Sequence, residues 1–252
     1  MLKQLISIYQ ESPVSIGAKE SLLPPSEVFN ERWFAAATLL AWQRAGAQGV
    51  GDVLPPLTQQ PLNTRFYASV AVRPPTGKRR FRDPWSDDPS LCLHGLAGNL
   101  TLDRAKQQAK LEQNFGFVAL VEAVLAQPSQ EVQQSHGAFW HKVLWLVDLL
   151  HWTGYHGGAL VRVFVFHPSN LHLAADYSTQ RIEQQITRWA EAQRWPFLIY
   201  DGPPPPPLRW QDVLSDIQII QRTWEDLAST VPDPAFAQYY QQWQRHNSAS
   251  AT

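Results

Sequence analysis

Apolar residues recur at spacings of three and four along much of the chain, and this spacing predicts helices with one apolar face. Ser26 can cap the first of these helices, and the glycines at 46 and 49 end it. The helix at 138–152 has few polar positions, so we expect it to be buried on most sides. The predicted helices cover residues 26–45, 138–152, 178–193, 209–229 and 234–245.

Short runs rich in β-branched and aromatic residues, bounded by proline and glycine, predict strands. These runs are 65–72, 91–102, 160–166 and 196–200. The last two runs flank the helix at 178–193, so the three elements predict a βαβ unit with parallel strands.

Two segments leave their structure open. Residues 115–126 (FGFVALVEAVLA) are so apolar that both a buried strand and a buried helix fit them. Residues 103–113 fit either a helix or the exposed end of a hairpin.

The order of these elements predicts an α/β fold. We expect a central mixed sheet of about four to five strands, flanked by helices. Five consecutive prolines at 203–207 favour an extended, stiff spacer, and a C-terminal helical tail follows them. We therefore place an α/β core at 1–202 and the spacer and tail at 203–252.

Composition limits the classes of protein that fit. The 252 residues are 44% hydrophobic and only 17% charged, which is enough apolar surface for a sizeable core and excludes a mainly disordered chain. The net charge is −1, so nucleic-acid binding would need a local basic patch. No apolar run approaches the roughly 20 residues of a membrane span, and the N-terminus lacks a secretory signal. We expect a cytoplasmic protein with no membrane contact.

Glu122 is the first candidate for chemistry. If 117–126 is a strand, Glu122 shares its buried face with Val118, Leu120 and Val124, where a carboxylate is costly unless it is paired or binds a cation. Asp103 follows the preceding apolar stretch, and two carboxylates on adjacent strands can hold Mg²⁺ for phosphodiester hydrolysis. If the segment is a helix, Glu122 simply faces solvent.

A family resemblance follows from the order of these motifs. Asn30-Glu31-Arg32 lies in an early helix, a middle strand ends in an acidic turn, and FVALVEA precedes a core helix and VRVFVFHPS. Over residues 26–200 this order resembles the PD-(D/E)xK restriction-endonuclease-like superfamily.

The resemblance implies an Mg²⁺-dependent nuclease. It implies that Asp103 and Glu122 are the metal ligands and catalytic carboxylates. Val124 occupies the position of the motif's lysine, which orients the attacking water in that family. The resemblance implies either that Lys142 or His141 on the following helix replaces this lysine, or that catalysis is lost and binding remains.

A basic loop is the second candidate. Arginine and aromatic side chains together can grip phosphates and stack on unpaired bases. The predicted nucleic-acid-binding residues are Arg73, Lys78, Arg79, Arg80, Arg82 and Trp85. Because Asp83, Asp87 and Asp88 follow at once, a loop with self-compensating charge and an interface with an acidic protein also fit.

Histidine is the third candidate, since six of the eight histidines lie between residues 136 and 172. Their spacing contains no pair four residues apart on a helix, and Cys92 is the single cysteine. This pattern favours helix-end and loop histidines over a metal-dependent hydrolase.

Two functions of different classes remain open. The first is a nuclease-like domain with impaired catalysis that binds nucleic acid within a defence or processing assembly. The alternative is a non-catalytic scaffold that docks a protein partner through a Trp-rich surface and its C-terminal helices. The eleven tryptophans equally fit a large core in which Trp is filler.

Overall fold

A five-stranded mixed sheet forms the centre of the protein in a computed structural model. Its strand order is β1-β2-β5-β6-β7, in which β1, β2 and β5 are antiparallel and β6 and β7 run parallel to β5. The strands are β1 (Arg65–Val72), β2 (Leu91–Gly98), β5 (Phe117–Ala123), β6 (Leu160–His167) and β7 (Gln218–Thr223). The structure describes residues 29–56, 64–73, 91–126, 139–155, 157–173, 177–193, 210–231 and 234–249.

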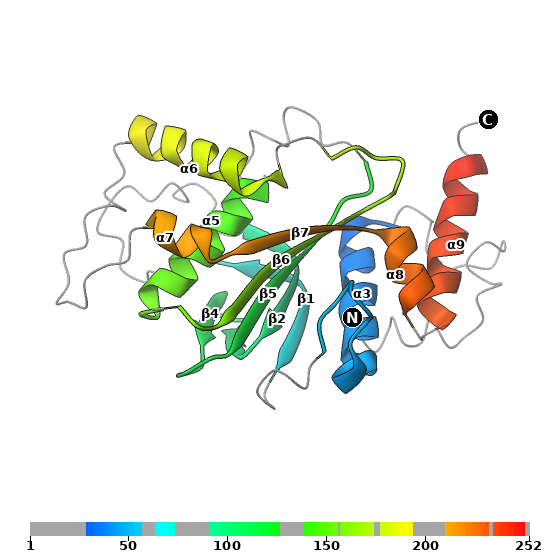
Figure 1. The fold of residues 1–252 in the computed structure, drawn as a ribbon, viewed down its shortest axis with the longest axis horizontal. Coiled ribbons are helices and arrows are strands. Elements are labelled where there is room, and N and C mark those ends of the chain that lie inside the picture. Colours follow the sequence, from blue (N-terminus) through cyan, green and yellow to red (C-terminus); the bar gives the residue numbers. More distant parts are fainter. Residues whose placement is uncertain are drawn as a thin grey trace.

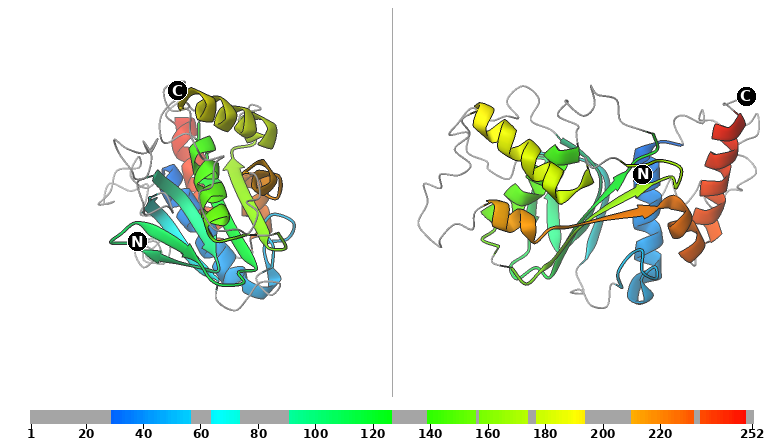
Figure 2. Two further views of the ribbon diagram at one scale, coloured as in Figure 1. Left: turned by 90° about the vertical axis from the view of Figure 1, so that its left-hand side faces the viewer. Right: turned by 45° about the horizontal axis from the view of Figure 1, so that its top comes forward.

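Helices cover both faces of the sheet, as Figures 1 and 2 show. One face carries α5 (Phe139–Trp152), α6 (Thr179–Gln193) and α7 (Trp210–Ser215), and their apolar side chains form the first core with the sheet. The other face carries α3 (Glu31–Ala45), α8 (Trp224–Thr230) and α9 (Pro234–Ala249), which form the second core. A short 3-10 helix, η2 (Gly46–Gln48), follows α3. The predicted α/β fold with a mixed sheet is confirmed.

A small hairpin of β3 (Leu100–Asp103) and β4 (Gln108–Leu111) leaves the main sheet after β2. Gly98 has φ +150°, and a Cβ there would lie 2.6 Å from the carbonyl oxygen of Phe117, so only glycine fits this close approach. The Asn99 side chain then accepts hydrogen bonds from the backbone of Gly116 and Phe117 at 3.1 and 3.0 Å. The hairpin is one of the two alternatives that the sequence allowed for 103–113.

The apolar segment around Glu122 is a strand, β5, with every residue buried. Its parallel pairing with β6 and antiparallel pairing with β2 place it in the middle of the sheet. A central strand has both faces covered, which explains why its sequence is continuously apolar rather than alternating.

The single helix predicted at 209–229 is wrong. This stretch contains α7, then β7, then α8. The segment is rich in β-branched residues, which favour extended structure. These residues are Ile217, Ile219, Ile220 and Thr223. The segment accordingly forms an edge strand beside β6. The predicted strand at 196–200, the Ser26 cap and the proline spacer lie outside the described residues; the side chain that caps α3 is Asn30.

Tryptophan mainly fills the cores. Trp42, Trp145 and Trp224 are among the largest fully buried side chains, and Trp210 and Trp243 are also buried. On α9, Phe236 and Tyr239 lie inside the second core, and the ring of Tyr239 lies 4.9 Å from that of Phe34 on α3. The C-terminal helix therefore uses its aromatic face within this molecule.

We expect Phe236→Ala to destabilise the whole domain by about 3–5 kcal/mol, because it leaves a cavity in the second core. Chemical denaturation should show one cooperative transition at lower denaturant. Gln241→Ala, an exposed position on the same helix, is the matched control and should change stability by less than about 0.5 kcal/mol. Equal effects of the two substitutions would contradict the packing of α9 against α3.

Candidate functional site

Glu122 faces the first core from β5. Side chains alternate along this strand, so Val118 and Leu120 point to the layer of α5, whereas Ala119 and Val121 point to the layer of α3. Glu122 continues the first set, and its side chain is only 10% exposed. An isolated carboxylate in such surroundings loses its hydration at a cost of several kcal/mol, so it needs a compensating charge.

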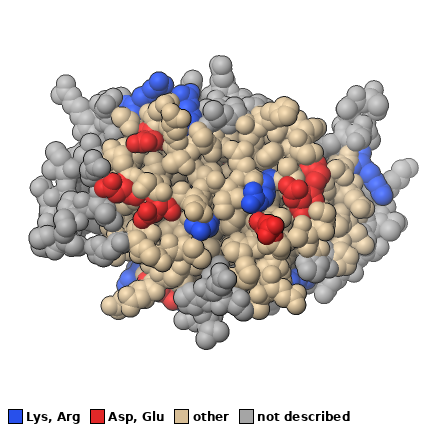
Figure 3. All heavy atoms as spheres, viewed as in Figure 1, with Lys and Arg blue, Asp and Glu red and all other residues tan. Residues whose placement is uncertain are grey.

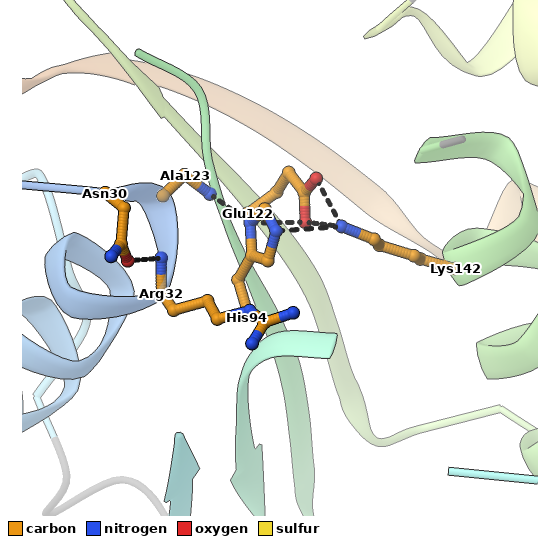
Figure 4. A network of polar contacts seen from close by, with 6 residues as sticks. All are labelled: Asn30, Arg32, His94, Glu122, Ala123 and Lys142. Carbon is orange, nitrogen blue, oxygen red and sulfur yellow. Dashed lines mark hydrogen bonds and ion pairs between the residues drawn. The ribbon is translucent and has the colours of Figure 1, made fainter. Parts of the chain in front are cut away.

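Lys142 supplies that charge from α5 (Figure 4). Its Nζ donates to Oε1 and Oε2 of Glu122 at 2.6 and 2.7 Å, and the lysine side chain is only 5% exposed. Nε2 of His94 lies 3.4 Å from the same Nζ atom. Both carboxylate oxygens of Glu122 therefore accept from the lysine, and the His94 ring lies beside the same ammonium group.

His94 completes this group, which we call the Glu122 cluster (Glu122, Lys142 and His94). It lies on β2, next in register after the pair Gly95–Val121, and its Nδ1 is 3.3 Å from Oε2 of Glu122. Burial lowers the pKa of His94, and this effect outweighs the opposing attraction of Glu122. The imidazole is therefore neutral near pH 7.

The two ring nitrogens of His94 have different neighbours. Nδ1 accepts a hydrogen bond from the backbone N–H of Ala123 at 3.3 Å and also lies 3.3 Å from Oε2 of Glu122. Nε2 faces the Lys142 ammonium at 3.4 Å. The imidazole therefore contacts the backbone of β5 and both charges of the cluster.

The sheet is irregular beside His94. The β1–β2 pairing runs through Ala68–Gly95 and Val70–Leu93 and omits Ser69, which lies opposite His94. Ser69 has φ +48°, a left-handed conformation that costs free energy in a residue with a side chain. Backbone strain of this kind gathers at functional sites, so it marks the neighbourhood of His94 as a candidate.

The first turn of α3 borders the cluster. The charge of Glu31 raises the pKa of His94 and that of Arg32 lowers it, which places both residues within electrostatic range. Figure 4 shows the Arg32 side chain extending towards His94. Asn30 fixes this turn, because its side chain accepts hydrogen bonds from the backbone of Arg32 and Trp33 at 3.1 and 3.2 Å.

Asp103 does not join the cluster. Its carboxylate caps the turn of the β3–β4 hairpin, where it accepts hydrogen bonds from the backbone of Ala105 and Lys106 at 3.1 Å each, and it lies 3.6 Å from the Lys106 ammonium. The hydrogen bond from Lys106 is the main reason why the pKa of Asp103 is lowered. The expected pairing of Asp103 with Glu122 is therefore not what the structure shows.

A magnesium ion does not fit the residues at hand. Within the described ranges, no group of three or more His, Cys, Asp or Glu side chains is placed to hold a metal. Both oxygens of Glu122 already accept from Lys142. The Glu122 cluster is thus a closed ion pair with a neutral imidazole, and no step of a metal-dependent reaction can be derived from it.

Most of the basic loop lies outside the described residues, including Lys78, Arg79, Arg80, Arg82 and Trp85. Arg73 is exposed, but its Nε donates to the Gln107 side chain at 3.0 Å and its carbonyl oxygen accepts from the Trp145 indole at 3.0 Å. Arg73 therefore ties β1 to the β3–β4 hairpin and to α5. On the face shown in Figure 3, charged side chains are few and both signs are scattered.

Of the six histidines between 136 and 172, His136 and His156 lie outside the described residues. The four described ones do not gather into a metal site. His141 is buried on α5, His151 is half-buried near the end of the same helix, and His172 is exposed. Nδ1 of His167 contacts the carbonyl oxygen of Pro168 at 2.9 Å. The histidine that joins the candidate site, His94, is outside this sequence cluster.

Comparisons with known proteins identify no relative. No model of a protein family matches the chain, and no curated protein or solved structure is significantly similar to it. None of the helices in the described ranges has the length and apolar character of a membrane span.

We expect Lys142→Met to destabilise the protein by about 3–5 kcal/mol, because it leaves a buried carboxylate without a counter-charge. Urea denaturation at neutral pH measures this loss. Lys106→Met is the matched control, since the Lys106–Asp103 pair is exposed and its loss should cost less than about 1 kcal/mol. If both variants lose the same small amount, Glu122 does not depend on Lys142.

The lowered pKa of His94 predicts a pH dependence of stability. The unfolded chain takes up a proton on this histidine as the pH falls below 6.5, whereas the folded protein takes it up only at lower pH. Stability is therefore complete above pH 6.5 and decreases below it, by at most about 1.4 kcal/mol per pH unit for this one group.

Replacing His94 by glutamine should make the fall in stability between pH 7 and pH 5 shallower. His151→Gln is the comparison, because burial lowers the pKa of His151 as well, from a position that is only half-buried. Unfolding curves across this range measure the slopes. An unchanged slope in His94→Gln would show that His94 is not kept neutral by the fold.

Proposed function

We propose that this chain is a nuclease-like α/β domain that has lost metal-dependent cleavage and acts by binding nucleic acid. The observation that carries the proposal is the Glu122–Lys142 pair, in which the lysine of the helix after β5 occupies both oxygens of the strand's carboxylate. The place of the domain in a defence or processing assembly is part of the same proposal.

The order of the elements supports the nuclease-like class. The sequence resemblance rests on an early helix, a middle strand that ends in an acidic turn, an apolar strand with a glutamate, a core helix and a further strand. The chain has α3, β3 ending at Asp103, β5, α5 and β6 in this order, and β5 carries Glu122. Lys142 lies on the core helix, where the resemblance allows the motif's lysine to be replaced.

The state of the carboxylates supports binding without cleavage. A metal-dependent nuclease needs oxygen ligands that are free to hold the ion and a site open to water. Glu122 is engaged by Lys142, Asp103 is engaged by its own hairpin turn, and the described residues supply no further group of three donors. This engagement of both carboxylates supports a domain that binds without cleaving.

The position of the basic segment supports nucleic acid as the ligand. Four of the five predicted phosphate-binding cations lie between Arg73 and Leu91. This part of the chain follows the end of β1 and precedes the start of β2. Leu91 is three residues from His94, and the exposed Arg32 borders His94 from α3. This segment therefore joins β1 to β2, the strand that carries His94.

The proposal is tested by separating cleavage from binding. We expect wild type and Glu122→Gln to show the same background cleavage of single-stranded and duplex substrates with Mg²⁺ or Mn²⁺. We expect wild type to bind single strands without metal, with an affinity that falls as salt rises. Arg79→Ala/Arg80→Ala should reduce the slope of log K against log salt by about 1.4 to 1.8, as expected for two lost phosphate contacts.

Two results would contradict this function. The first is metal-dependent cleavage that disappears in Glu122→Gln, which would show that the site is catalytic. The other is an unchanged salt slope in Arg79→Ala/Arg80→Ala, which would show that the basic segment does not contact the nucleic acid. Lys106→Ala is the control for loss of a positive charge elsewhere.

A further inference from the structure

The ammonium group of Lys142 stands where a bidentate carboxylate would hold a metal ion. It lies 2.6 and 2.7 Å from the two oxygens of Glu122, so it is centred on the carboxylate rather than on one oxygen. Bidentate contact with both oxygens is also how carboxylates bind divalent cations. The lysine therefore supplies, through a covalent tether, the positive charge that a metal would supply.

His94 gives this position a second donor of the kind that metals use. A neutral imidazole is a common metal ligand. Its Nε2 lies 3.4 Å from Nζ of Lys142, so this nitrogen faces the position that the ammonium occupies on the carboxylate. An ion in that position would have both the carboxylate and an imidazole nitrogen beside it.

The three side chains of the Glu122 cluster differ in exposure. The side chain of His94 is 19% exposed, that of Glu122 is 10% exposed and that of Lys142 is 5% exposed. His94 is thus the most exposed member and Lys142 the most buried.

We propose that Lys142 is the permanent cation of this site and that it closes a latent divalent-metal site formed by Glu122 and His94. This inference rests on the proposed function and deepens it, because it gives the proposed loss of metal-dependent cleavage a structural cause. Shortening the lysine leaves a buried negative charge, a neighbouring imidazole and room for water, which together bind a divalent cation.

The test uses thermal unfolding of the full chain after EDTA treatment and dialysis. We measure each protein alone and with about 1 mM MgCl₂, MnCl₂ or ZnCl₂. The proteins are wild type, Lys142→Ser, Lys142→Ser/His94→Gln and the surface control Lys106→Ser. We expect less than about 1 °C of ion-dependent change in wild type and Lys106→Ser. We expect at least one ion to raise the Tm of Lys142→Ser by about 3–10 °C, and His94→Gln to remove this gain.

Two outcomes would overturn the inference. One is a metal-dependent rise in the Tm of wild type that Glu122→Gln abolishes, because the site would then accept a metal with Lys142 in place. The other is no gain in Lys142→Ser, including the case in which this variant stays unfolded with every ion. Neither result involves nucleic acid, so a failure of oligonucleotide binding by wild type would contradict the proposed function separately.

Discussion

The buried contact between the Glu122 carboxylate and the Lys142 ammonium is the constraint on which the account of this site depends. Neither charge is tolerable alone at the sheet–helix interface, since each loses its hydration there. Each partner satisfies the other: the lysine donates to both carboxylate oxygens, and the His94 ring lies beside the same ammonium group. The contact also joins β5 to α5, so the central strand and the most buried helix are held in one relative position.

The three-layer architecture makes this contact possible. Because β5 is central, its residues alternate between two separate apolar cores, and only the set that faces α5 can meet Lys142. The same alternation sends Phe117 and Val121 towards α3 and the aromatic side chains of α9. The C-terminal residues contribute β7 to the sheet and Phe236 to the second core, so the fold around the site uses both ends of the described chain.

Local patterns predicted much of the fold, and two of the three residues of the Glu122 cluster were named from the sequence. The α/β class and most elements follow from periodicity. Glu122 could be named because a charge in an apolar run is expensive, whereas Lys142 was named through the resemblance, as a replacement for the motif's lysine. His94 was missed because its place depends on the antiparallel register of β2 and β5 and on the irregular pairing at Ser69, which a single sequence does not specify. Asp103 was misplaced because Gly98 and Asn99 redirect the chain into a hairpin that uses this carboxylate as a cap. The strand β7 was missed because it has six residues between two helices and its burial does not alternate, so its sequence resembles a continuing helix.

The mutual dependence of the two buried charges is tested most directly by a double-mutant cycle. The cycle combines Glu122→Gln with Lys142→Met and compares free energies of unfolding at neutral pH. If the two charges depend on each other as described, each single variant is strongly destabilised, the double variant recovers much of the loss, and the coupling free energy is at least about 2 kcal/mol. Additive effects, with a coupling below about 0.5 kcal/mol, would contradict the account, since each charge would then be stable in the folded protein without the other.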